Sequence, residues 1–535
     1  MNKRSIQLAA AAVWAGLFVP ACPGAQEAKS SAQIMPSTMP RMGSVDERFL
    51  SYNIEMVEVT GGRFWRPYDS KVDAILAAQS ATKEKGGANQ PVGMNPELYQ
   101  YLPPIDLGNA RLRKLAAALG PAYLRVSGTW QNSTYFQDSD GPAPEAAPTG
   151  FKGVLTRAEW KGVIDFSHTA DAKIITSFAT SMGTRDSAGV WTPDQAAKFL
   201  AYTKSIGGSI AAAEYMNEPT FAAMGGAPPG YDAAAYARDV AVFVPFIRKT
   251  APDMIILGPG SIGEGFALAP VAMHMISTED MLKATGPVFD AFSYHFYGTI
   301  SQRCAASMGG KAGTTPEAAL SEEWLSRTDT VEAFYAVLRD RFLPGKPMWL
   351  TETGQAACGG DRWASTFIDT FRYLNQLGTL AQRGVQVVAH NTLSASDYGL
   401  LDEKTFAPRP DYWAALLWRR LMGTTVLNPG ESPDAKLKIY AHCLRNAPGG
   451  VALLVINTDR GAATSLKVPA AERYTLTAAK LLDTTVELNG RELRLGADDS
   501  LPALAGTATQ AGNVTFAPVS ITFLAIPKAK NAACR

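Results

Sequence analysis

The sequence predicts an α/β protein, a (β/α)8 TIM barrel followed by a C-terminal all-β sandwich domain. Two observations favour this class. Through the first three-quarters of the 535 residues, short apolar segments alternate with amphipathic ones, and after about Leu427 only short, strand-like segments follow. Eight strand–helix units in a row favour a closed barrel over an open, doubly wound sheet, and no GxGxxG turn follows an early strand.

The N-terminal residues predict export rather than folded structure. Lys3 and Arg4 precede an apolar run over residues 6–19, which is typical of a secretory signal peptide. We assign residues 1–25 to this signal and residues 26–45, rich in Ser, Pro, Ala and Met, to a linker. The stretch ending at Cys22 loosely resembles a lipobox, although Pro20 fits poorly, so lipidation and plain cleavage both stay open. We expect a periplasmic, extracellular or lipid-anchored protein.

The barrel is assigned to residues 46–425. Its candidate strands are apolar or β-branched and end in polar or glycine-containing turns; they cover residues 50–56, 122–127, 173–178, 209–216, 254–258, 289–294, 348–352 and 385–390. Helical periodicity lies between them, for example over residues 112–119, 231–250, 322–340, 363–380 and 412–422. Thr192-Pro193-Asp194-Gln195 predicts a capping box that opens a helix ending near residue 206.

The β-sandwich is assigned to residues 426–535, with strand-like segments at 451–456, 465–468, 480–488 and 521–526. Four cysteines remain after Cys22, and an even number in an exported chain indicates disulfides. Three pairings are possible. The chain order favours Cys304 with Cys358 in the first domain and Cys443 with Cys534 in the second.

Composition excludes several classes of protein. The formal net charge is +1 and no run of five like charges occurs, which argues against a nucleic-acid-binding protein. Only five histidines are present and no CxxC spacing occurs, so we expect no metal and no cofactor. We expect a monomer that touches a membrane only if Cys22 is lipidated.

Two glutamates are the strongest candidates for catalysis. Glu218, in Asn217-Glu218-Pro219, follows the fourth candidate strand, and Glu352 ends the seventh. Barrel enzymes place catalytic groups at the carboxyl ends of their strands, so both glutamates are expected at one mouth. One carboxylate on each side of a glycosidic bond, one donating a proton and one attacking the anomeric carbon, is the arrangement of a retaining glycosidase. Two surface glutamates beyond strand ends are the weaker interpretation.

Longer motifs resemble one family. Asn217-Glu218 and Glu352 look like the clan of retaining (β/α)8 glycosidases, and two segments narrow the match to glycoside hydrolase family 79, the heparanase and β-glucuronidase family. These segments are Pro121-Ala122-Tyr123-Leu124-Arg125 and, more specifically, Asp411-Tyr412-Trp413 continuing to Val426-Leu427. The resemblance runs in order from about Phe49 to Leu427 and suggests a bacterial member.

The resemblance implies a role for each matching residue. Glu218 would be the acid/base and Glu352 the nucleophile. Asn217 would meet the 2-hydroxyl of the substrate, Tyr297 would hydrogen-bond the nucleophile, and His295 would line the site. Family members bind the uronic acid carboxylate through backbone N–H groups that match Cys358 and Gly359, and through a tyrosine that matches Tyr398. This chain departs by carrying Cys358 where mammalian heparanases carry glycine, so a disulfide could hold the loop.

Two further positions follow from the predicted strands. Glu55 at the end of the first strand and Thr129 after the second would face sugar hydroxyls in the mouth. The resulting hypothesis is retaining hydrolysis of β-linked glucuronic acid. It leaves open endo cleavage of heparan-sulfate-like chains and exo cleavage of glucuronide ends. The alternatives are a glycosidase of the same clan acting on a neutral sugar and a non-catalytic protein that binds polysaccharide.

Overall fold

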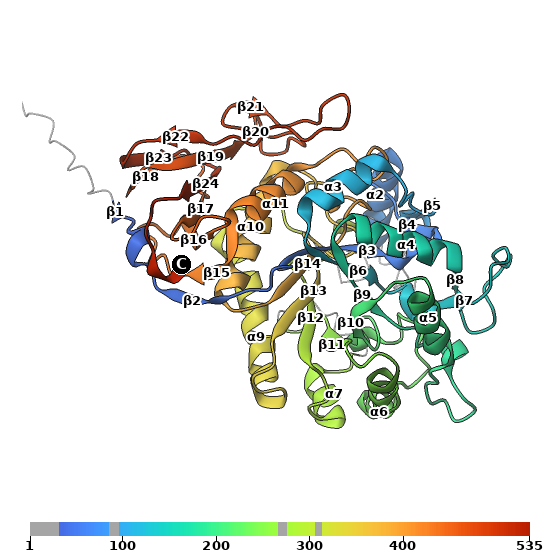
Figure 1. Ribbon diagram of the computed structural model, residues 1–535. Helices are drawn as coiled ribbons and strands as arrows, with labels where there is room; N and C mark the ends of the chain where they lie inside the picture. Colours follow the sequence, from blue (N-terminus) through green and yellow to red (C-terminus); the bar gives the residue numbers. More distant parts are fainter. Residues whose placement is uncertain (1–31, 85–95, 266–274, 305–312) are drawn as a thin grey trace, which may run out of the picture.

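The computed structural model describes residues 32–84, 96–265, 275–304 and 313–535 (Figure 1). The predicted signal peptide and Cys22 lie outside these residues. In the part of the chain that is described, no helix combines the length and the apolar character needed to cross a bilayer.

Eight parallel strands close into a barrel, which confirms the predicted fold class. Each predicted strand overlaps an observed one, and each pairs with its neighbours in chain order until β14 closes on β3. The strands are β3 (Leu50–Glu55), β6 (Ala122–Ser127), β9 (Ala172–Ser177), β10 (Ile210–Glu214), β11 (Ile255–Ser261), β12 (Ala291–Tyr297), β13 (Met348–Gly354) and β14 (Val387–His390).

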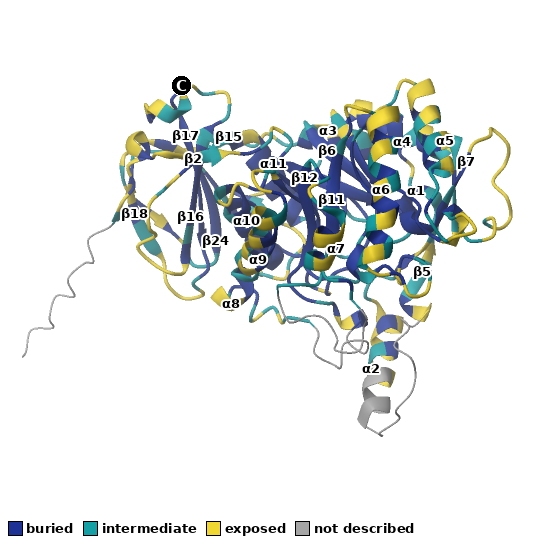
Figure 2. Ribbon diagram, turned by 90° about the horizontal axis from the view of Figure 1, so that it is seen from below, coloured by how far each residue is buried: buried dark blue, intermediate teal, exposed yellow. Residues whose placement is uncertain are grey.

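Helices surround the barrel and separate it from solvent (Figure 2). In α3 the side chains of Leu112, Leu115, Ala116 and Leu119 are buried, because helical spacing puts them on the face that packs on the strands. The helices that follow the strands are α3 (Ala110–Leu119), α4 (Arg157–Thr169), α5 (Asp194–Ser205), α6 (Ala233–Thr250), α7 (Thr278–Thr285), α9 (Arg327–Phe342), α10 (Phe367–Gln382) and α11 (Pro410–Leu421).

Two helix predictions were wrong in detail. Helix α5 has Pro193 at its N-cap without a side-chain cap, because the Thr192 hydroxyl donates to Thr184 instead and the predicted capping box does not form. The segment predicted as one helix over residues 322–340 is divided at Ser326 into α8 (Glu322–Leu325) and α9. Ser321 caps the short first helix by accepting a bond from the Trp324 N–H.

An insertion that the sequence did not predict lies between β3 and α3. It contains α1 (Met56–Thr60), the hairpin of β4 (Gly62–Trp65) and β5 (Tyr99–Leu102), and α2 (Ser70–Glu84). A second small addition, the parallel pair β7 (Thr134–Gln137) and β8 (Gly153–Thr156), follows β6. Both additions leave the order of the barrel strands unchanged.

The C-terminal residues form two facing sheets. The larger runs β2 (Arg41–Ser44), β15 (Met422–Leu427), β16 (Leu437–Leu444), β17 (Val451–Asn457), β24 (Ser520–Ile526), β19 (Ala471–Thr477), β20 (Glu487–Leu488) and β21 (Arg491–Glu492), with β22 (Thr507–Thr509) beside β19. The smaller runs β1 (Ala32–Gln33), β18 (Thr464–Val468) and β23 (Gly512–Phe516). Of the predicted segment 480–488 only the last two residues are in a strand, because a turn occupies the rest.

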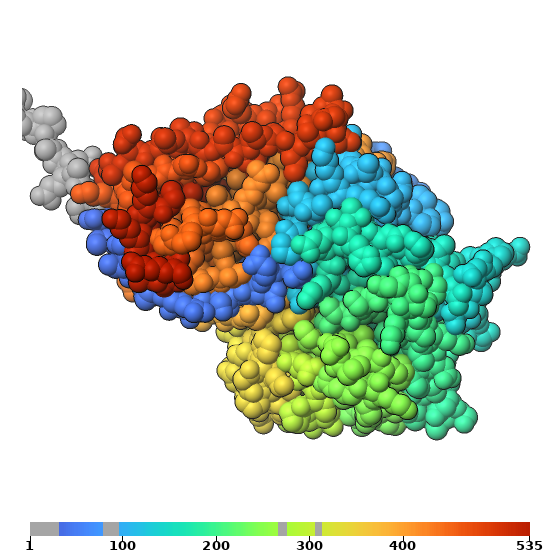
Figure 3. Space-filling view, in the orientation of Figure 1, coloured from blue at the N-terminus to red at the C-terminus, as the bar shows by residue number. Residues whose placement is uncertain are grey.

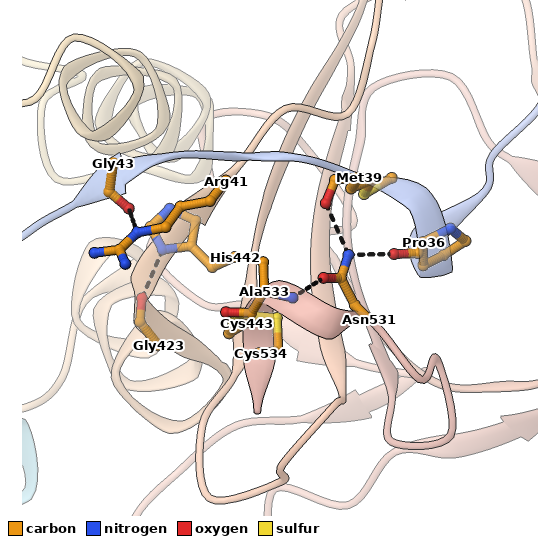
Figure 4. The surroundings of a disulfide bond; sticks show 10 residues. All are labelled: Pro36, Met39, Arg41, Gly43, Gly423, His442, Cys443, Asn531, Ala533 and Cys534. Atoms are coloured by element: carbon orange, nitrogen blue, oxygen red, sulfur yellow. Dashed lines mark hydrogen bonds between the residues drawn. A yellow bond between two sulfur atoms is a disulfide. The ribbon is translucent and has the colours of Figure 1, made fainter.

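The predicted linker contributes strands to these sheets. β1 pairs with β18 and β2 pairs with β15, so residues 32–44 lie against the C-terminal strands. The Asn531 amide donates to the carbonyls of Pro36 and Met39, at 2.6 and 2.9 Å, next to the Cys443–Cys534 disulfide (Figure 4). Residues 32–44 are therefore joined to the C-terminal strands and to Asn531, while the division into domains stays a prediction.

The β-sheets pack directly on two barrel helices, α10 and α11. In Figure 3 the red atoms of the C-terminal strands lie directly against orange atoms of the preceding residues. Tyr440 of β16 lies over Gly378 of α10, where an added Cβ would come within 2.3 Å of the ring. The Tyr440 hydroxyl donates to Asn375 at 2.7 Å, and His442 meets the ring of Trp418 edge-on. One apolar cluster continues from the barrel helices into these strands, so the two parts share a core.

Candidate active site

The two candidate catalytic glutamates meet at the mouth of the barrel. Glu352 lies within β13, and Glu218 follows β10 in the left-handed region at φ 49°. One carboxylate oxygen of each residue and a ring nitrogen of His295 all lie within 4.8 Å of one another. Residues 134 positions apart in the sequence (352 minus 218) are therefore brought to a separation that one sugar ring can bridge.

Both oxygens of Glu352 accept hydrogen bonds. The Tyr297 hydroxyl donates to Oε1 at 2.8 Å, and Arg125 Nη1 donates to Oε2 at 2.7 Å. Only 8% of the Glu352 side chain is exposed. A buried carboxylate needs such partners to stay ionised, and an ionised carboxylate is what a nucleophile requires.

Arg125 connects the strands beneath the two glutamates. Its Nη2 donates to Asn217 Oδ1 at 2.7 Å and to Glu214 Oε2 at 3.1 Å. The Thr351 hydroxyl donates to the other oxygen of Glu214 at 2.7 Å. Burial would raise the pKa of Glu214, but Arg125 and the His295 hydrogen bond hold it below its usual range. Arg125 and Glu214 are thus a fully buried ion pair that supports Glu352 and Asn217 together.

His295 is a cation next to the candidate acid/base. Burial alone would lower its pKa, yet the nearby carboxylates of Glu352, Glu214 and Glu218 raise the pKa of His295 to about 9. Its Nδ1 lies 3.0 Å from Glu218 Oε1 and its Nε2 3.8 Å from Glu214 Oε1. Arg125 Nη2 lies 3.2 Å from the other ring nitrogen, Nε2.

Glu218 has the environment of a proton donor. Burial and the charge of Glu352 raise its pKa, while the hydrogen bond from His295 opposes the rise. Its side chain is 17% exposed, more than Glu352, so solvent and a leaving group can reach it. Two carboxylates with different environments at one site are the expected pattern for an acid and a nucleophile.

Glu55 lies in the same mouth. Burial and the charge of Glu352 raise the pKa of its carboxyl well above the usual value. Among the described residues, its Oε2 has no hydrogen-bond partner. Gly128 lies directly against it, and a Cβ there would fall 1.5 Å from Oε2. A glycine at 128 is therefore required for Glu55 to occupy this position. Thr129 lies in the following turn and is partly exposed.

Asn217 is held by a second asparagine. The Asn132 amide donates to the Asn217 carbonyl and its Oδ1 accepts from the Asn217 N–H, both at 2.9 Å. Arg125 donates to Asn217 Oδ1, so the amide NH2 group of Asn217 can donate to other partners. The sequence singled out Asn217 but not the two residues that orient it.

The predicted carboxylate-binding residues lie beside Tyr297. The Asn391 amide donates to the hydroxyls of both Tyr297 and Tyr398, at 2.9 and 3.1 Å. Gly360 packs on Tyr398, where an added Cβ would lie 3.2 Å from the tyrosine Cβ. Cys358, Gly359 and Gly360 all have positive φ, at 65°, 83° and 80°. These residues therefore form a tight loop next to the tyrosines of the site.

Sequence reasoning missed Arg125, Glu214 and Asn391 as site residues. A signal was present for the first two, because each is a charged residue in an otherwise apolar strand, at a position that alternation turns into the barrel. Asn391 directly follows β14. Its position resembles those of Glu218 and Glu352, so reading every polar residue after a strand would have found it.

The three groups Glu218, His295 and Glu352 also have a spacing that could hold a metal ion. However, Arg125 and the protonated His295 already supply positive charge there, and Glu352 uses both oxygens for hydrogen bonds. The electrostatics therefore fit a sugar ring and a proton transfer better than a divalent cation.

Known proteins with similar sequences support this chemistry. The family model for glycosyl hydrolase family 79, N-terminal domain, matches residues 101–378, more than half of the 535 residues. Heparanase of Mus musculus is 29% identical over 488 residues, covering 80% of this chain and 88% of its own. Baicalin-beta-D-glucuronidase of Scutellaria baicalensis is 35% identical over 189 residues, covering 34% of this chain and 36% of its own.

A solved structure supports the fold. The 4-O-alpha-L-rhamnosyl-beta-D-glucuronidase of Fusarium oxysporum superposes with a TM-score of 0.60 at 13% identity, covering 92% of this chain and all of that one. The paired glutamates, the barrel and the match to the family model agree. The chain belongs to glycosyl hydrolase family 79 and is a glycoside hydrolase.

Proposed function

We propose that the protein cleaves β-linked glucuronic acid residues with retention of configuration. The observation that carries this proposal is the separation of Glu218 and Glu352, whose carboxylate oxygens lie within 4.8 Å. Retaining glycosidases keep their carboxyl groups about 5–5.5 Å apart, whereas inverting enzymes leave about 6.5–9.5 Å for a water molecule. The short separation leaves room for direct attack on the sugar.

The reaction takes two steps. Glu352 attacks the anomeric carbon while Glu218 gives its proton to the leaving oxygen, so the glycosidic bond breaks and a glycosyl ester forms. Glu218, now ionised, takes a proton from water, and the resulting hydroxyl attacks the anomeric carbon and releases Glu352. The raised pKa of Glu218 suits the first step, and the cationic His295 stabilises the carboxylate that the first step produces.

Other groups in the mouth have proposed roles in binding. The amide NH2 group of Asn217 is positioned to donate to the 2-hydroxyl of the sugar. Thr129 would hydrogen-bond a further hydroxyl. Glu55, whose pKa is raised by burial and by the charge of Glu352, is positioned to bond sugar hydroxyls. The Tyr297 hydroxyl, which donates to Glu352 Oε1, would hold this carboxylate in position for attack.

The relatives support a glucuronic acid substrate. Heparanase of Mus musculus is similar over 80% of this chain, and baicalin-beta-D-glucuronidase of Scutellaria baicalensis over 34% of it. In this chain the proposed carboxylate contacts are the N–H groups of Cys358 and Gly359 and the hydroxyl of Tyr398. The substrate is a glucuronic-acid-containing oligo- or polysaccharide, cut inside a heparan-sulfate-like chain or at a glucuronide end.

We also propose that the protein is exported and acts as a monomer. Its two disulfides are typical of proteins from oxidising compartments.

Purified protein would be tested on p-nitrophenyl β-glucuronide, on heparan sulfate and on p-nitrophenyl β-glucoside. Hydrolysis of either glucuronate substrate supports the proposal, and the preferred one separates exo from endo cleavage. NMR of the first product would show a β-anomer for a retaining enzyme. Folded protein that cleaves only the β-glucoside would replace the uronic acid assignment with a neutral sugar.

A further inference from the structure

The loop over residues 356–361, here named the carboxylate loop, is joined to the loop after β12. Beyond the barrel strands, the Ala357 N–H donates to the Thr299 carbonyl at 2.9 Å and the Ser301 N–H donates to the Ala357 carbonyl at 3.0 Å. The Cys304–Cys358 disulfide then links the same two loops across 54 positions of sequence. The carboxylate loop is therefore fixed from one side by a neighbour that carries none of the catalytic glutamates.

Arg303, next to Cys304, binds the other side of the same backbone. Its Nη1 donates to the carbonyls of Gly360 and Cys358, at 2.7 and 3.2 Å. Its Nε donates to the Arg66 carbonyl at 3.0 Å, its Nη2 pairs with Asp397, and its guanidinium lies 3.9 Å over the Tyr68 ring. The side chain is fully buried, so this rigid fork holds three loops together at once.

These bonds occupy the carbonyls of the carboxylate loop and leave amide donors. The Gly359 carbonyl accepts from the Ser396 hydroxyl at 2.9 Å and from the Asp397 N–H at 3.1 Å. In a trans peptide the carbonyl and the following N–H point in opposite directions, so bonds to carbonyls also fix the directions of the amides. Within the described residues, the N–H groups of Cys358 and Gly359 have no acceptor.

Adjacent free amides suit an anion only when they are held in place. Two of the three residues with positive φ are glycines, which have wide conformational freedom, so the loop by itself would sample many directions. One backbone bond lies within the loop, from the Gly360 N–H to the Ala356 carbonyl at 3.1 Å. The Cys358 and Gly359 peptides are restrained from outside, by Arg303, Ser301, Ser396 and the disulfide.

We propose that Arg303 and the Cys304–Cys358 disulfide are positioning residues that hold the Cys358 and Gly359 amides for the carboxylate of the substrate. This inference rests on the proposed function and deepens it. In this proposal the preference for a uronic acid over a neutral sugar depends on Arg303 and the disulfide, which are not catalytic groups. Releasing the support weakens substrate binding and leaves the chemical step intact, because Glu218 and Glu352 are held by other residues.

The test compares two double variants that each lack one disulfide. C304S/C358S releases the carboxylate loop, and C443S/C534S removes the disulfide of the β-sheets as a matched control. With p-nitrophenyl β-glucuronide, we expect C304S/C358S to raise KM by about 10-fold while kcat stays within about twofold. The inhibition constant of glucuronic acid should rise by a similar factor and that of glucose should not change. C443S/C534S should change neither KM nor the inhibition constant of glucuronic acid.

Arg303→Lys and Arg303→Gln distinguish the role of the branched guanidinium group from the role of its positive charge. Lysine keeps the charge beside Asp397, but its single nitrogen cannot reach the Arg66 carbonyl, Asp397 and the two loop carbonyls together. It should therefore give part of the KM effect and glutamine the whole of it. Circular dichroism and melting temperatures identify variants that fail to fold. If an Arg303 variant fails to fold, the comparison of C304S/C358S with C443S/C534S tests the proposal instead. An equal loss of kcat on the β-glucuronide and the β-glucoside would overturn this proposal alone. So would an unchanged KM of C304S/C358S for the β-glucuronide. Wild-type protein without activity on either p-nitrophenyl β-glucuronide or heparan sulfate would overturn the proposed function and this inference with it.

Discussion

The two ends of the barrel use the same eight strands but have opposite contents. At the amino-terminal end the strands turn apolar residues inward, and these pack into a separate cluster that contains Tyr123, Ile175, Ala212, Leu257, Ala291, Trp349 and Val387. At the carboxyl end the inward positions carry charges. Arg125 lies two residues after Tyr123, and Glu214 two residues after Ala212. A single step of the strand period therefore separates the apolar core from the charged site.

Burial does not distinguish these ends, because Trp349 is 4% exposed and Arg125 and Glu214 are not exposed at all. The difference is the number of polar partners. The rings of Tyr123 and Trp349 need only each other, at 4.9 Å between centroids, whereas Arg125 contacts Glu352, Glu214 and Asn217. Buried charges persist only when they are paired in this way. Substitutions at the apolar end should therefore change stability, and substitutions at the charged end should change rate.

The largest effect is expected for Glu352→Gln. Without the nucleophile the glycosyl ester cannot form, so kcat should fall by about 10⁴-fold or more. The matched control is Glu332→Gln on α9, a buried glutamate on the outside of the barrel, whose kcat should stay close to that of the wild type. A Glu352→Gln enzyme that retains a tenth of the rate would show that the charged end is not where the reaction occurs.

Glu218→Gln should depend on the leaving group. Removing the proton donor should slow substrates with a sugar leaving group by about 10²–10⁴-fold. A nitrophenolate leaves without protonation, so the first step on the aryl glycoside should be affected far less. Steady-state rates on both substrates, with azide added to rescue the second step, provide the measurement. Equal losses on both substrates would contradict the acid/base assignment.

Trp349→Ala tests the apolar end. Removing a buried tryptophan should lower the free energy of unfolding by about 3–5 kcal/mol, because the cavity cannot be filled. Urea unfolding followed by circular dichroism measures this loss. Trp349→Phe serves as the smaller change and should cost less. At a temperature where the variant is folded, kcat should equal that of the wild type; a large fall in kcat would break the comparison between the two ends.

The smallest effect is a displacement of the pH profile in His295→Asn. The protonated His295 lowers the pKa of Glu218, so its removal should raise that pKa and move the alkaline limb of kcat/KM to higher pH. In the wild type, His295 has a folded-state pKa raised to about 9, so its contribution to stability is present below its unfolded pKa and is lost as the pH rises through about 9. Melting temperatures between pH 7 and 10 should fall for the wild type more than for the variant. An alkaline limb that does not move, or moves down, would remove His295 from this role.

Much of the barrel could be predicted from local pattern. Each strand is a short apolar run between polar turns, so its position follows from residues that are adjacent in the sequence. Glu218 and Glu352 could be named as candidates for the same reason, since each follows or ends such a run. The insertion between β3 and α3 and the strands β1 and β2 were missed because their pairing partners are far away in the chain, and two or four residues alone carry no periodicity.

The sequence alone determined the order of the eight barrel strands and of the helices that follow them, the two candidate catalytic glutamates and the cysteines that could pair. The tertiary structure decided which buried charges neutralise one another. Arg125 acquires its role only when β6, β10 and β13 close into one barrel and put Glu214 and Glu352 within 3.1 Å of its guanidinium. The contacts of Arg303 and Cys304 with the carboxylate loop depend in the same way on two neighbouring strands, β12 and β13. Electrostatic energy depends on the distance between charges in space, and that distance cannot be derived from their separation along the chain.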